Sequence, residues 1–411
     1  MDPVRNPYAP GAGQRPPELA GRDAELDAFG VVLERIARGR PERSLILTGL
    51  RGVGKTVLLN AMRSAAVRAR WGTGKLEARP DQPLRRPLAA ALHLSVRELA
   101  PRQKDEAEQV LGVLKSFAMK EEGGGSASGR GATRLRDRWQ PGIDAAAVPG
   151  RADSGDIEID LVELFTDIGG LAADCGRGVA VFIDEMQDLG PDDVSALCAA
   201  AHEISQTGLP FVVVGAGLPH LPAVLSASKS YSERLFRYAR IDRLDPGAAD
   251  LALRSPAQEE GADWTPDALA AMYAVTAGYP YFVQAYGKVA WDVAPASPIT
   301  ADDVKVAAPE AETELAVGFF GSRYERATPA EREYLRAMAD LAVPGGSGAV
   351  PAVEEPVATS AIADLLGRKP QSLSPARDAL IKKGLVYSGE RGRIAFTVPH
   401  FGRYLRQHAS E

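Results

Sequence analysis

Cysteine is scarce in this sequence of 411 residues, and long hydrophobic runs are missing. Two cysteines, Cys175 and Cys198, are too few for a metal cluster or a disulfide framework, which fits a reducing compartment. No run of roughly 18 apolar residues exists to span a bilayer. The N-terminus has Pro and Gly where a secretory signal needs an unbroken apolar stretch. We therefore expect a soluble, cytoplasmic protein without a membrane partner.

Charge is unevenly distributed along the chain. The net charge of −6 argues against a protein coated in nucleic acid. Residues 359–411 nevertheless hold nine Lys and Arg against four Asp and Glu, a local charge of +5. The five histidines are scattered without metal-ligand spacing, so no zinc site is predicted.

Strand and helix patterns alternate over the first 245 residues, which predicts a parallel sheet with helices on both faces. Residues 246–322 show helical patterns only, and residues 328–411 form a separate basic unit after a Gly/Pro-rich spacer. Residues 1–18 have the composition of a flexible leader. The low-complexity stretch at 121–155 is predicted to be a mobile insertion. The predicted core strands are 44–50, 88–96, 178–184 and 210–215.

Residues 49–56 match the phosphate-binding pattern G-x-x-x-x-G-K-[ST] in full, between a strand pattern and a helix pattern. The glycines let successive N–H groups face phosphates, and the helix N-terminus adds partial positive charge. Lys55 is expected to reach the β and γ phosphates, and Thr56 offers a hydroxyl to Mg²⁺. A structural Gly-rich turn is the alternative, which the complete pattern disfavours. The residues predicted to hold ATP here are Gly49, Leu50, Arg51, Gly52, Val53, Gly54, Lys55, Thr56 and Val57.

Two adjacent acids, Asp184 and Glu185, follow four consecutive apolar residues of a predicted central strand. Ligands of such sheets bind beyond the carboxyl ends of the strands. Asp184 is therefore predicted to hold Mg²⁺ and Glu185 to polarise an attacking water. A helix cap or a solvated turn is the alternative interpretation of this pair. The sequence thus predicts a Mg²⁺-dependent ATP hydrolase.

These features together resemble an AAA+ ATPase, and within that superfamily the origin-recognition-complex-like and archaeal STAND-type branches. The segment 19–26 resembles their G-R-x-x-E-L box, and Gly278-Tyr-Pro280 resembles their G-x-P motif. The resemblance implies that Gly21, Arg22, Tyr279 and Pro280 lie near the nucleotide. It also implies an α/β P-loop core (19–245), an all-α lid domain (246–322) and a C-terminal winged-helix domain (328–411).

The sequence departs from the family pattern at the sensor positions. The strand near 211–217 lacks a sensor 1 Asn or Thr, and the helix after Gly278 lacks a sensor 2 arginine. The resemblance implies an arginine finger that acts on a neighbouring subunit, and hence a homo-oligomer formed on ATP binding. Arg234 and Arg237 are the candidates for it, with surface ion pairs as the alternative. These gaps predict slow or partner-stimulated turnover.

Residues 359–398 show a helix-turn-helix pattern followed by two strands that resemble a wing. Outward polar residues and local positive charge favour contact with duplex DNA, whereas packing against a protein is the alternative. The leading hypothesis is an ATP-driven switch that controls DNA binding. The alternative is a STAND-like signalling NTPase whose C-terminal domain binds a protein partner. The predicted DNA contacts are Gln371, Ser372, Ser374, Arg377, Arg391 and Arg393.

Overall fold

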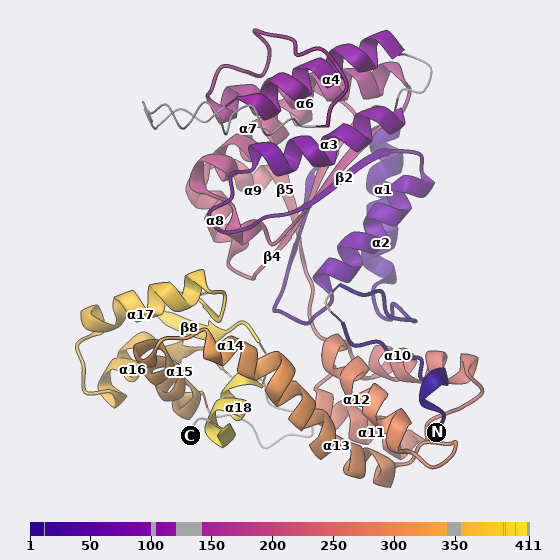
Figure 1. Ribbon diagram of the computed structural model, residues 1–411, viewed down its shortest axis with the longest axis vertical. Helices are drawn as coiled ribbons and strands as arrows, with labels where there is room; N and C mark the ends of the chain where they lie inside the picture. Colours follow the sequence, from indigo (N-terminus) through magenta and orange to yellow (C-terminus); the bar gives the residue numbers. More distant parts are fainter. Residues whose placement is uncertain are drawn as a thin grey trace.

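The computed structural model of the protein describes residues 1–11, 13–99, 104–120, 142–342, 355–388, 390, 392–398 and 400–408. It has three lobes (Figure 1): an α/β core, a helical lid domain and a smaller C-terminal domain. The C-terminal domain lies beside both the core and the lid domain. Among the residues that the structure describes, no helix combines the length and the apolar character needed to cross a membrane.

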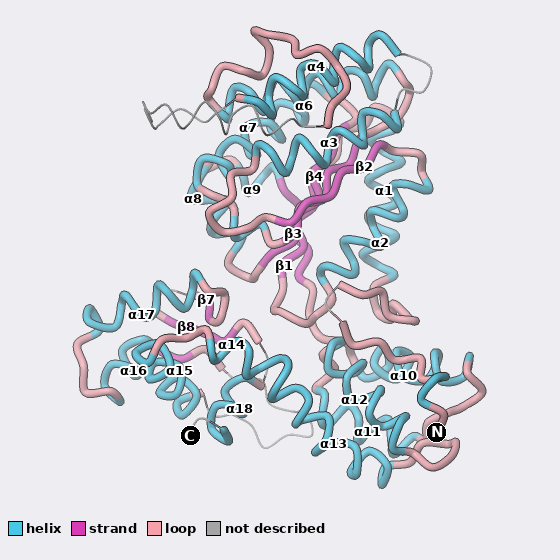
Figure 2. The backbone as a smooth tube through the Cα atoms, viewed as in Figure 1, coloured by secondary structure: helices cyan, strands magenta, loops and turns pink. Residues whose placement is uncertain are grey.

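The core is built on a parallel sheet of five strands in the order β2-β3-β4-β1-β5 (Figure 2). Because all strands are parallel, their carboxyl ends share one edge, and this edge carries the predicted phosphate loop and carboxylates. The predicted fold class, an α/β P-loop core with helical domains, is confirmed. The strands are β1 (Ser44–Thr48), β2 (Gly72–Glu77), β3 (Val179–Asp184), β4 (Phe211–Gly217) and β5 (Phe236–Arg240).

Alternate side chains of each buried strand enter two different hydrophobic cores, as the two-residue period of a strand requires. Phe182 packs with Phe29 on one face, whereas Val181 and Ile183 pack with residues of α3, α6 and α7 on the other. The core helices are α1 (Asp23–Ala37), α2 (Lys55–Arg68), α3 (Arg85–Leu99), α4 (Lys104–Met119), α6 (Ile157–Asp174), α7 (Pro191–Thr207), α8 (Leu221–Ser228) and α9 (Ser232–Leu235), with a short 3-10 turn η2 (Met186–Asp188).

The strand predicted at 88–96 is wrong, because these residues belong to helix α3. Leu88, Leu92 and Val96 recur every four residues and face the core, which is a helical period. The second strand is instead β2, whose Gly72 and Gly74 lie against α3. A Cβ on Gly74 would lie 2.7 Å from the Ala91 carbonyl oxygen, so only glycine permits this close approach.

The lid domain begins directly after the sheet and contains four helices. They are α10 (Pro246–Glu259), α11 (Pro266–Thr276), α12 (Pro280–Val293) and α13 (Ala301–Leu315), and most begin with proline, whose fixed φ suits the first turn. A π-helical turn η3 (Ala316–Gly321) and a short helix α14 (Ser322–Glu325) follow. We refer to residues 316–325 as the joint, because they connect the lid domain to the C-terminal domain.

The C-terminal domain combines helices with a small antiparallel sheet in the order β6-β8-β7. Helix α15 begins with a capping box in which Thr328 and Glu331 satisfy each other's backbone N–H groups. The elements are α15 (Pro329–Leu341), β6 (Val357–Ala358), α16 (Thr359–Leu365), α17 (Pro370–Lys382), β7 (Val386–Tyr387), β8 (Arg393–Phe396) and α18 (Phe401–His408).

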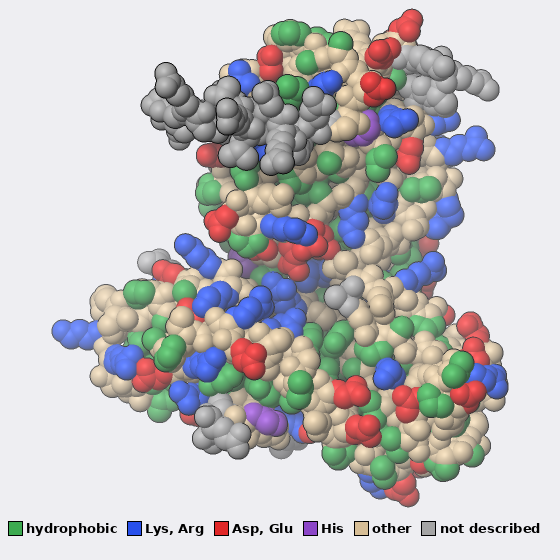
Figure 3. Space-filling model, in the orientation of Figure 1, with side chains coloured by type: hydrophobic (Ala, Val, Ile, Leu, Met, Phe, Trp, Pro, Cys, Tyr) green, Lys and Arg blue, Asp and Glu red, His purple; other side chains and the backbone are tan. Residues whose placement is uncertain are grey.

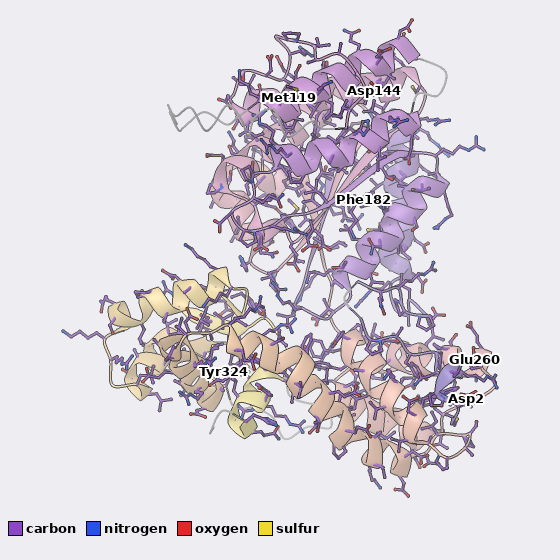
Figure 4. All side chains as sticks on the ribbon, in the orientation of Figure 1. Asp2, Met119, Asp144, Phe182, Glu260 and Tyr324 are labelled. Carbon is purple, nitrogen blue, oxygen red and sulfur yellow. The ribbon has the colours of Figure 1, made fainter. Side chains whose placement is uncertain are left out.

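The N-terminal segment, residues 1–18, differs from the predicted flexible leader. It carries a 3-10 turn, η1 (Pro3–Arg5), and lies on the lid domain, where Figure 4 labels Asp2 close to Glu260. Tyr8 is buried between Trp264 and Trp291. Its hydroxyl donates to the Leu253 carbonyl (2.6 Å) and accepts from Trp264 Nε1 (2.8 Å). Burial of this ring, together with hydrogen bonds from Arg5 to Glu260 and from Asn6 to Lys288 and Asp292, holds the segment on the lid domain.

The predicted insertion at 121–155 lies partly outside the described residues, which omit 121–141. The described remainder is tied to helix α4. Ser116 Oγ donates to the Val148 carbonyl and Lys115 Nζ to the Ala145 carbonyl, both at 2.8 Å. Ile143 and Ala145 of this remainder are buried. Residues 142–155 therefore belong to the core domain.

Replacing Tyr8 by Phe removes a hydroxyl that satisfies two buried polar groups. Because Trp264 Nε1–H then loses this acceptor and the Leu253 carbonyl loses one donor, we expect Tyr8→Phe to lower the free energy of unfolding by about 1–3 kcal/mol. Denaturant unfolding followed by tryptophan fluorescence measures the loss. An unchanged unfolding midpoint would contradict the described packing of the N-terminal segment.

Candidate nucleotide-binding site

The phosphate loop connects the end of β1 to the start of α2, as the sequence predicts. Gly52 and Gly54 have φ of 84° and 91°, which side-chain-bearing residues rarely adopt. Gly49 needs to be glycine for a different reason: a Cβ there would lie 2.2 Å from the Ile241 carbonyl oxygen, just past β5. The three glycines therefore permit the tight conformation in which the loop leads into the N-terminus of α2.

A cavity of about 410 Å³ opens over this loop. The core, the N-terminal segment, the lid domain and the joint all contribute to its walls, so the cavity lies at a domain interface, where ligand sites are common. Its lining includes Ala9, Pro10, Gly11, Gly13, Gln14, Pro16, Glu18, Leu19, Ala20 and Arg22, residues 51–57, Glu185, and Leu244, Ala252, Pro280, Tyr281, Val283, Gln284, Gly318, Phe319 and Arg323.

Lys55 is almost fully buried at the bottom of this cavity. Its ammonium donates to the carbonyl oxygens of Gly49 (2.9 Å) and Leu50 (2.8 Å). Burial lowers the Lys55 pKa to about 8, although Glu185 and Asp184 favour the charged form. A nearby anion stabilises the charged form of such a buried ammonium. The phosphates of a nucleotide can supply this anion.

Asp184 and Glu185 lie at the end of β3, at the edge of the sheet that carries the loop. Asp184 is buried, and its Oδ1 accepts from the Glu185 N–H at 3.0 Å. Glu185 has φ of 51°, a left-handed conformation that non-glycine residues hold only when neighbours enforce it. This backbone turns the Glu185 side chain into the cavity, where it is 23% exposed and accessible to water.

Two side chains position the Glu185 carboxylate. Gln187 Nε2 donates to Glu185 Oε2 at 2.6 Å, while Gln187 Oε1 accepts from the Leu218 N–H at 3.1 Å, directly after β4. Arg51 Nη1 lies 3.6 Å from Glu185 Oε1. Gln187 therefore links the carboxylate to the strand where sensor 1 is missing, a connection that no motif in the sequence indicates.

Thr56 and Asp184 offer hard oxygen donors that fit Mg²⁺. In the described part of the chain, no group of three or more His, Cys, Asp or Glu side chains has the arrangement of a metal site. Magnesium commonly takes one or two protein oxygens and completes its octahedron with phosphates and water. The residues present thus fit an ion that arrives with a nucleotide.

The backbone of the loop is hydrogen-bonded to several other parts of the chain, including the end of β4, where the Gly217 carbonyl accepts from the Gly49 N–H (3.2 Å). Arg22 Nη2 donates to the Val53 carbonyl (3.2 Å), and the Tyr281 N–H at the start of α12 donates to the Gly52 carbonyl (3.2 Å). The Arg51 N–H donates to the Thr397 carbonyl of the C-terminal domain (2.9 Å). The loop therefore contacts the segment before α1, the lid domain and the C-terminal domain at once.

Most of the residues predicted to contact the nucleotide line the cavity, and some do not. Arg22, Pro280 and residues 51–57 line it. Gly49 and Leu50 instead border a second cavity of about 550 Å³, between the core and the C-terminal domain. Tyr279 is buried and borders that second cavity too. Gly21 has φ of 67° and lies against Ala248.

Arg234 and Arg237 are exposed and lie away from the loop. Arg237 pairs in register with Leu45 near the start of β1, whereas the loop follows its end. Neither arginine lines the cavity, so the structure does not bring them to the site within one chain.

The predicted DNA contacts lie on α17 and near β8. Gln371 and Ser372 are exposed, and Ser374 and Arg377 are half-buried. Arg393 donates to the Pro356 carbonyl at 3.1 Å. Arg391 lies outside the described residues.

A glycine loop that follows a buried strand and carries a buried lysine, with an acidic pair on a nearby strand, defines a P-loop nucleotide-binding protein. Residues 18–214 match the family described as AAA ATPase domain, and residues 317–405 match a domain of unknown function, DUF8462. No curated protein has a significant match to the chain. The first family match and the fold support an AAA+ P-loop ATPase.

Among solved structures, the Walker-type ATPase PABY2304 of Pyrococcus abyssi has a TM-score of 0.56 at 17% identity, covering 95% of this chain and 97% of that chain. The RuvB Holliday junction branch migration motor of Thermotoga maritima has a TM-score of 0.43 at 17% identity, covering 93% and 96%. The Aeropyrum pernix ORC1 protein in complex with DNA has a TM-score of 0.42 at 15% identity, covering 96% and 94%. Only the first likeness is high enough to bear on the fold.

ATP binding is expected to take up protons above pH 8. Below pH 8 the Lys55 ammonium is largely charged, whereas at pH 9 most of it is neutral and needs a proton before it binds phosphate. We expect ATP affinity to fall roughly tenfold per pH unit above pH 8, with about one proton taken up at pH 9. Calorimetry in buffers of different ionisation enthalpy measures this uptake. Equal binding heats in all buffers at pH 9 would contradict the assignment.

Proposed function

We propose that the protein is an AAA+-type switch that binds ATP with Mg²⁺, hydrolyses it slowly or on stimulation by a partner, and thereby controls its C-terminal domain. The buried P-loop lysine, the donors for Mg²⁺ and the partly exposed Glu185 support the ATPase part. In this proposal Lys55 and the loop N–H groups neutralise phosphate charge, and Glu185 polarises the attacking water.

The observation that carries the switch is the hydrogen bond from the Arg51 N–H to the Thr397 carbonyl. Arg51 lies inside the phosphate loop. A change of loop conformation on nucleotide binding would therefore move or break its hydrogen bond to the C-terminal domain. Gly384 also lies against the Arg51 side chain, because a Cβ there would lie 2.7 Å from Arg51 Nη2. The two domains are thus joined at the phosphate site, and in this proposal nucleotide biases the contact between a formed and a broken state.

The proposed output of the switch is binding of duplex DNA by a winged helix. The order of helices α15 to α17 and strands β6 to β8 fits that fold, and α17 presents exposed Gln371 and Ser372 as a recognition helix requires. Figure 3 shows Lys and Arg gathered on the C-terminal domain where it faces the core. Such a patch supports contact with phosphates.

A protein partner is the second candidate for the output. Many basic side chains of the C-terminal domain already have acidic partners, which weakens the case for free phosphate-binding charge. These ion pairs are Arg368–Glu333, Arg377–Asp378, Lys383–Glu331, Arg393–Glu390 and Arg403–Glu312.

We also propose that ATP binding assembles a homo-oligomer. The exposed positions of Arg234 and Arg237, at the sheet edge away from the loop, suit a role toward a neighbouring subunit.

ATP turnover with and without duplex DNA tests the enzyme and its output together. We expect Glu185→Gln to lower turnover by about 100-fold or more, because the attacking water loses its base, while ATP binding persists. Stimulation of the wild-type rate by duplex DNA supports the DNA-linked switch, and a rate indifferent to DNA supports the protein partner. Equal turnover by wild type and Glu185→Gln would refute the role of Glu185.

The contact between the loop and the C-terminal domain has a matched pair of test variants. Gly384 and Gly367 have φ of 63° and 61°, so alanine strains both alike, but only Gly384 lies against Arg51. We expect Gly384→Ala to displace the Arg51 side chain and to change ATP turnover by up to about fivefold, the equivalent of about 1 kcal/mol. Gly367→Ala is expected to alter stability alone. Equal turnover by the two variants would argue against the coupling.

A further inference from the structure

Arg323 belongs to the joint, outside every motif of the sequence, yet it lines the cavity together with Lys55 and Glu185. It lies on α14, after the π-helical turn that ends the lid domain, and its neighbour Tyr324 is labelled there in Figure 4. A change in its position therefore acts on the connection between the lid domain and the C-terminal domain.

The Arg323 guanidinium is held in place by a stack of aromatic rings. It lies 4.0 Å from the centre of the Phe319 ring and donates to the Phe319 carbonyl. The Phe319 ring stacks on Tyr281 with centroids 4.7 Å apart. Tyr281 in turn donates its N–H to the Gly52 carbonyl in the phosphate loop. The stack connects Arg323 to the loop, so its fork of donors is pre-organised.

The charge around Arg323 is unbalanced. Among the described residues no carboxylate forms an ion pair with it, and the charges that act on it most strongly are those of Arg51 and Arg326. Burial together with this repulsion lowers the Arg323 pKa to about 10. A partly buried guanidinium next to a second guanidinium costs free energy unless an anion compensates it. The cavity that both arginines line is where such an anion fits.

The charged neighbours of Arg323 relate it to Glu185. Arg51, its strongest charged neighbour, lies 3.6 Å from Glu185, the carboxylate assigned to the attacking water. The N-terminal segment and Gln284 line the same cavity, and the Ala9 N–H donates to Gln284 Oε1. Through Arg51, Arg323 is thus coupled to the carboxylate that is proposed to act at the last phosphate.

We propose that Arg323 binds the terminal phosphate of ATP and, through the joint, makes the position of the C-terminal domain depend on that phosphate. The inference rests on the proposed ATPase function and names the residue that distinguishes ATP from ADP. ADP lacks the group that Arg323 contacts, so the joint relaxes after hydrolysis. The contact fills the role for which the lid helix after Gly278 has no arginine.

The test compares the affinities of ADP and of a non-hydrolysable ATP analogue, each with Mg²⁺, by calorimetry. We expect Arg323→Gln to lower the affinity for the ATP analogue by about 10- to 100-fold, the range for a charged hydrogen bond. The affinity for ADP is expected to change by less than about twofold. Arg323→Lys keeps the charge but loses the planar fork of donors. We therefore expect it to retain part of the preference for the ATP analogue over ADP.

Arg326→Gln is the matched control, because it removes the same charge three residues away from an exposed side chain outside the cavity lining. We expect it to leave the ratio of the two affinities unchanged. Equal weakening of ADP and the analogue by Arg323→Gln, an equal effect of Arg326→Gln, or no effect of Arg323→Gln would each overturn the inference. If the wild type binds neither nucleotide, the proposed function itself fails, which is a separate outcome.

Discussion

The backbone of the phosphate loop is the constraint on which the arrangement of the domains depends. A loop that curls its N–H groups toward one side leaves carbonyl and N–H groups on the other, and these need partners. Here Arg22 and Tyr281 bind two of the carbonyls, while Thr397 accepts from the Arg51 N–H. The partners come from three different parts of the chain. Each domain is therefore positioned by the same eight-residue loop.

Electrostatics explains why this loop can work as a switch. Lys55, Arg51 and Arg323 line one cavity, together with Arg22, and the carboxylates among its lining residues are Glu18 and Glu185. Concentrated positive charge in a partly buried site favours a polyanion, and it favours a triphosphate more than a diphosphate. Arg51 stands on the loop, Lys55 at the start of α2 and Arg323 on the joint. In the proposed switch, a phosphate that binds all three would change how these elements lie relative to one another.

The sequence predicts those parts of the site whose residues form a motif within one continuous segment. The glycines of the loop, Lys55, Asp184 and Glu185 sit in a strand-loop-helix context that can be recognised one segment at a time. Strand β2 was missed because Gly72 and Gly74 lower its strand character, and their reason lies in the packing of α3.

The residues that could not be predicted act through distant contacts. Arg323 and Gln187 gain their roles from contacts between segments far apart in the chain, and composition gives no signal for them. Tyr8 sits in a Pro/Gly-rich segment, and its burial between Trp264 and Trp291 shows that this segment packs on the lid domain. In each case the physical cause is tertiary packing, which no local pattern encodes.

The central claim is that the phosphate loop and the C-terminal domain respond to nucleotide as one unit. Amide hydrogen exchange, measured with and without Mg²⁺ and a non-hydrolysable ATP analogue, tests it most directly. We expect exchange to change in residues 49–56 and also in residues 384–398, because Arg51 and Thr397 share a hydrogen bond. Protection confined to residues 49–56, with residues 384–398 unchanged, would contradict it.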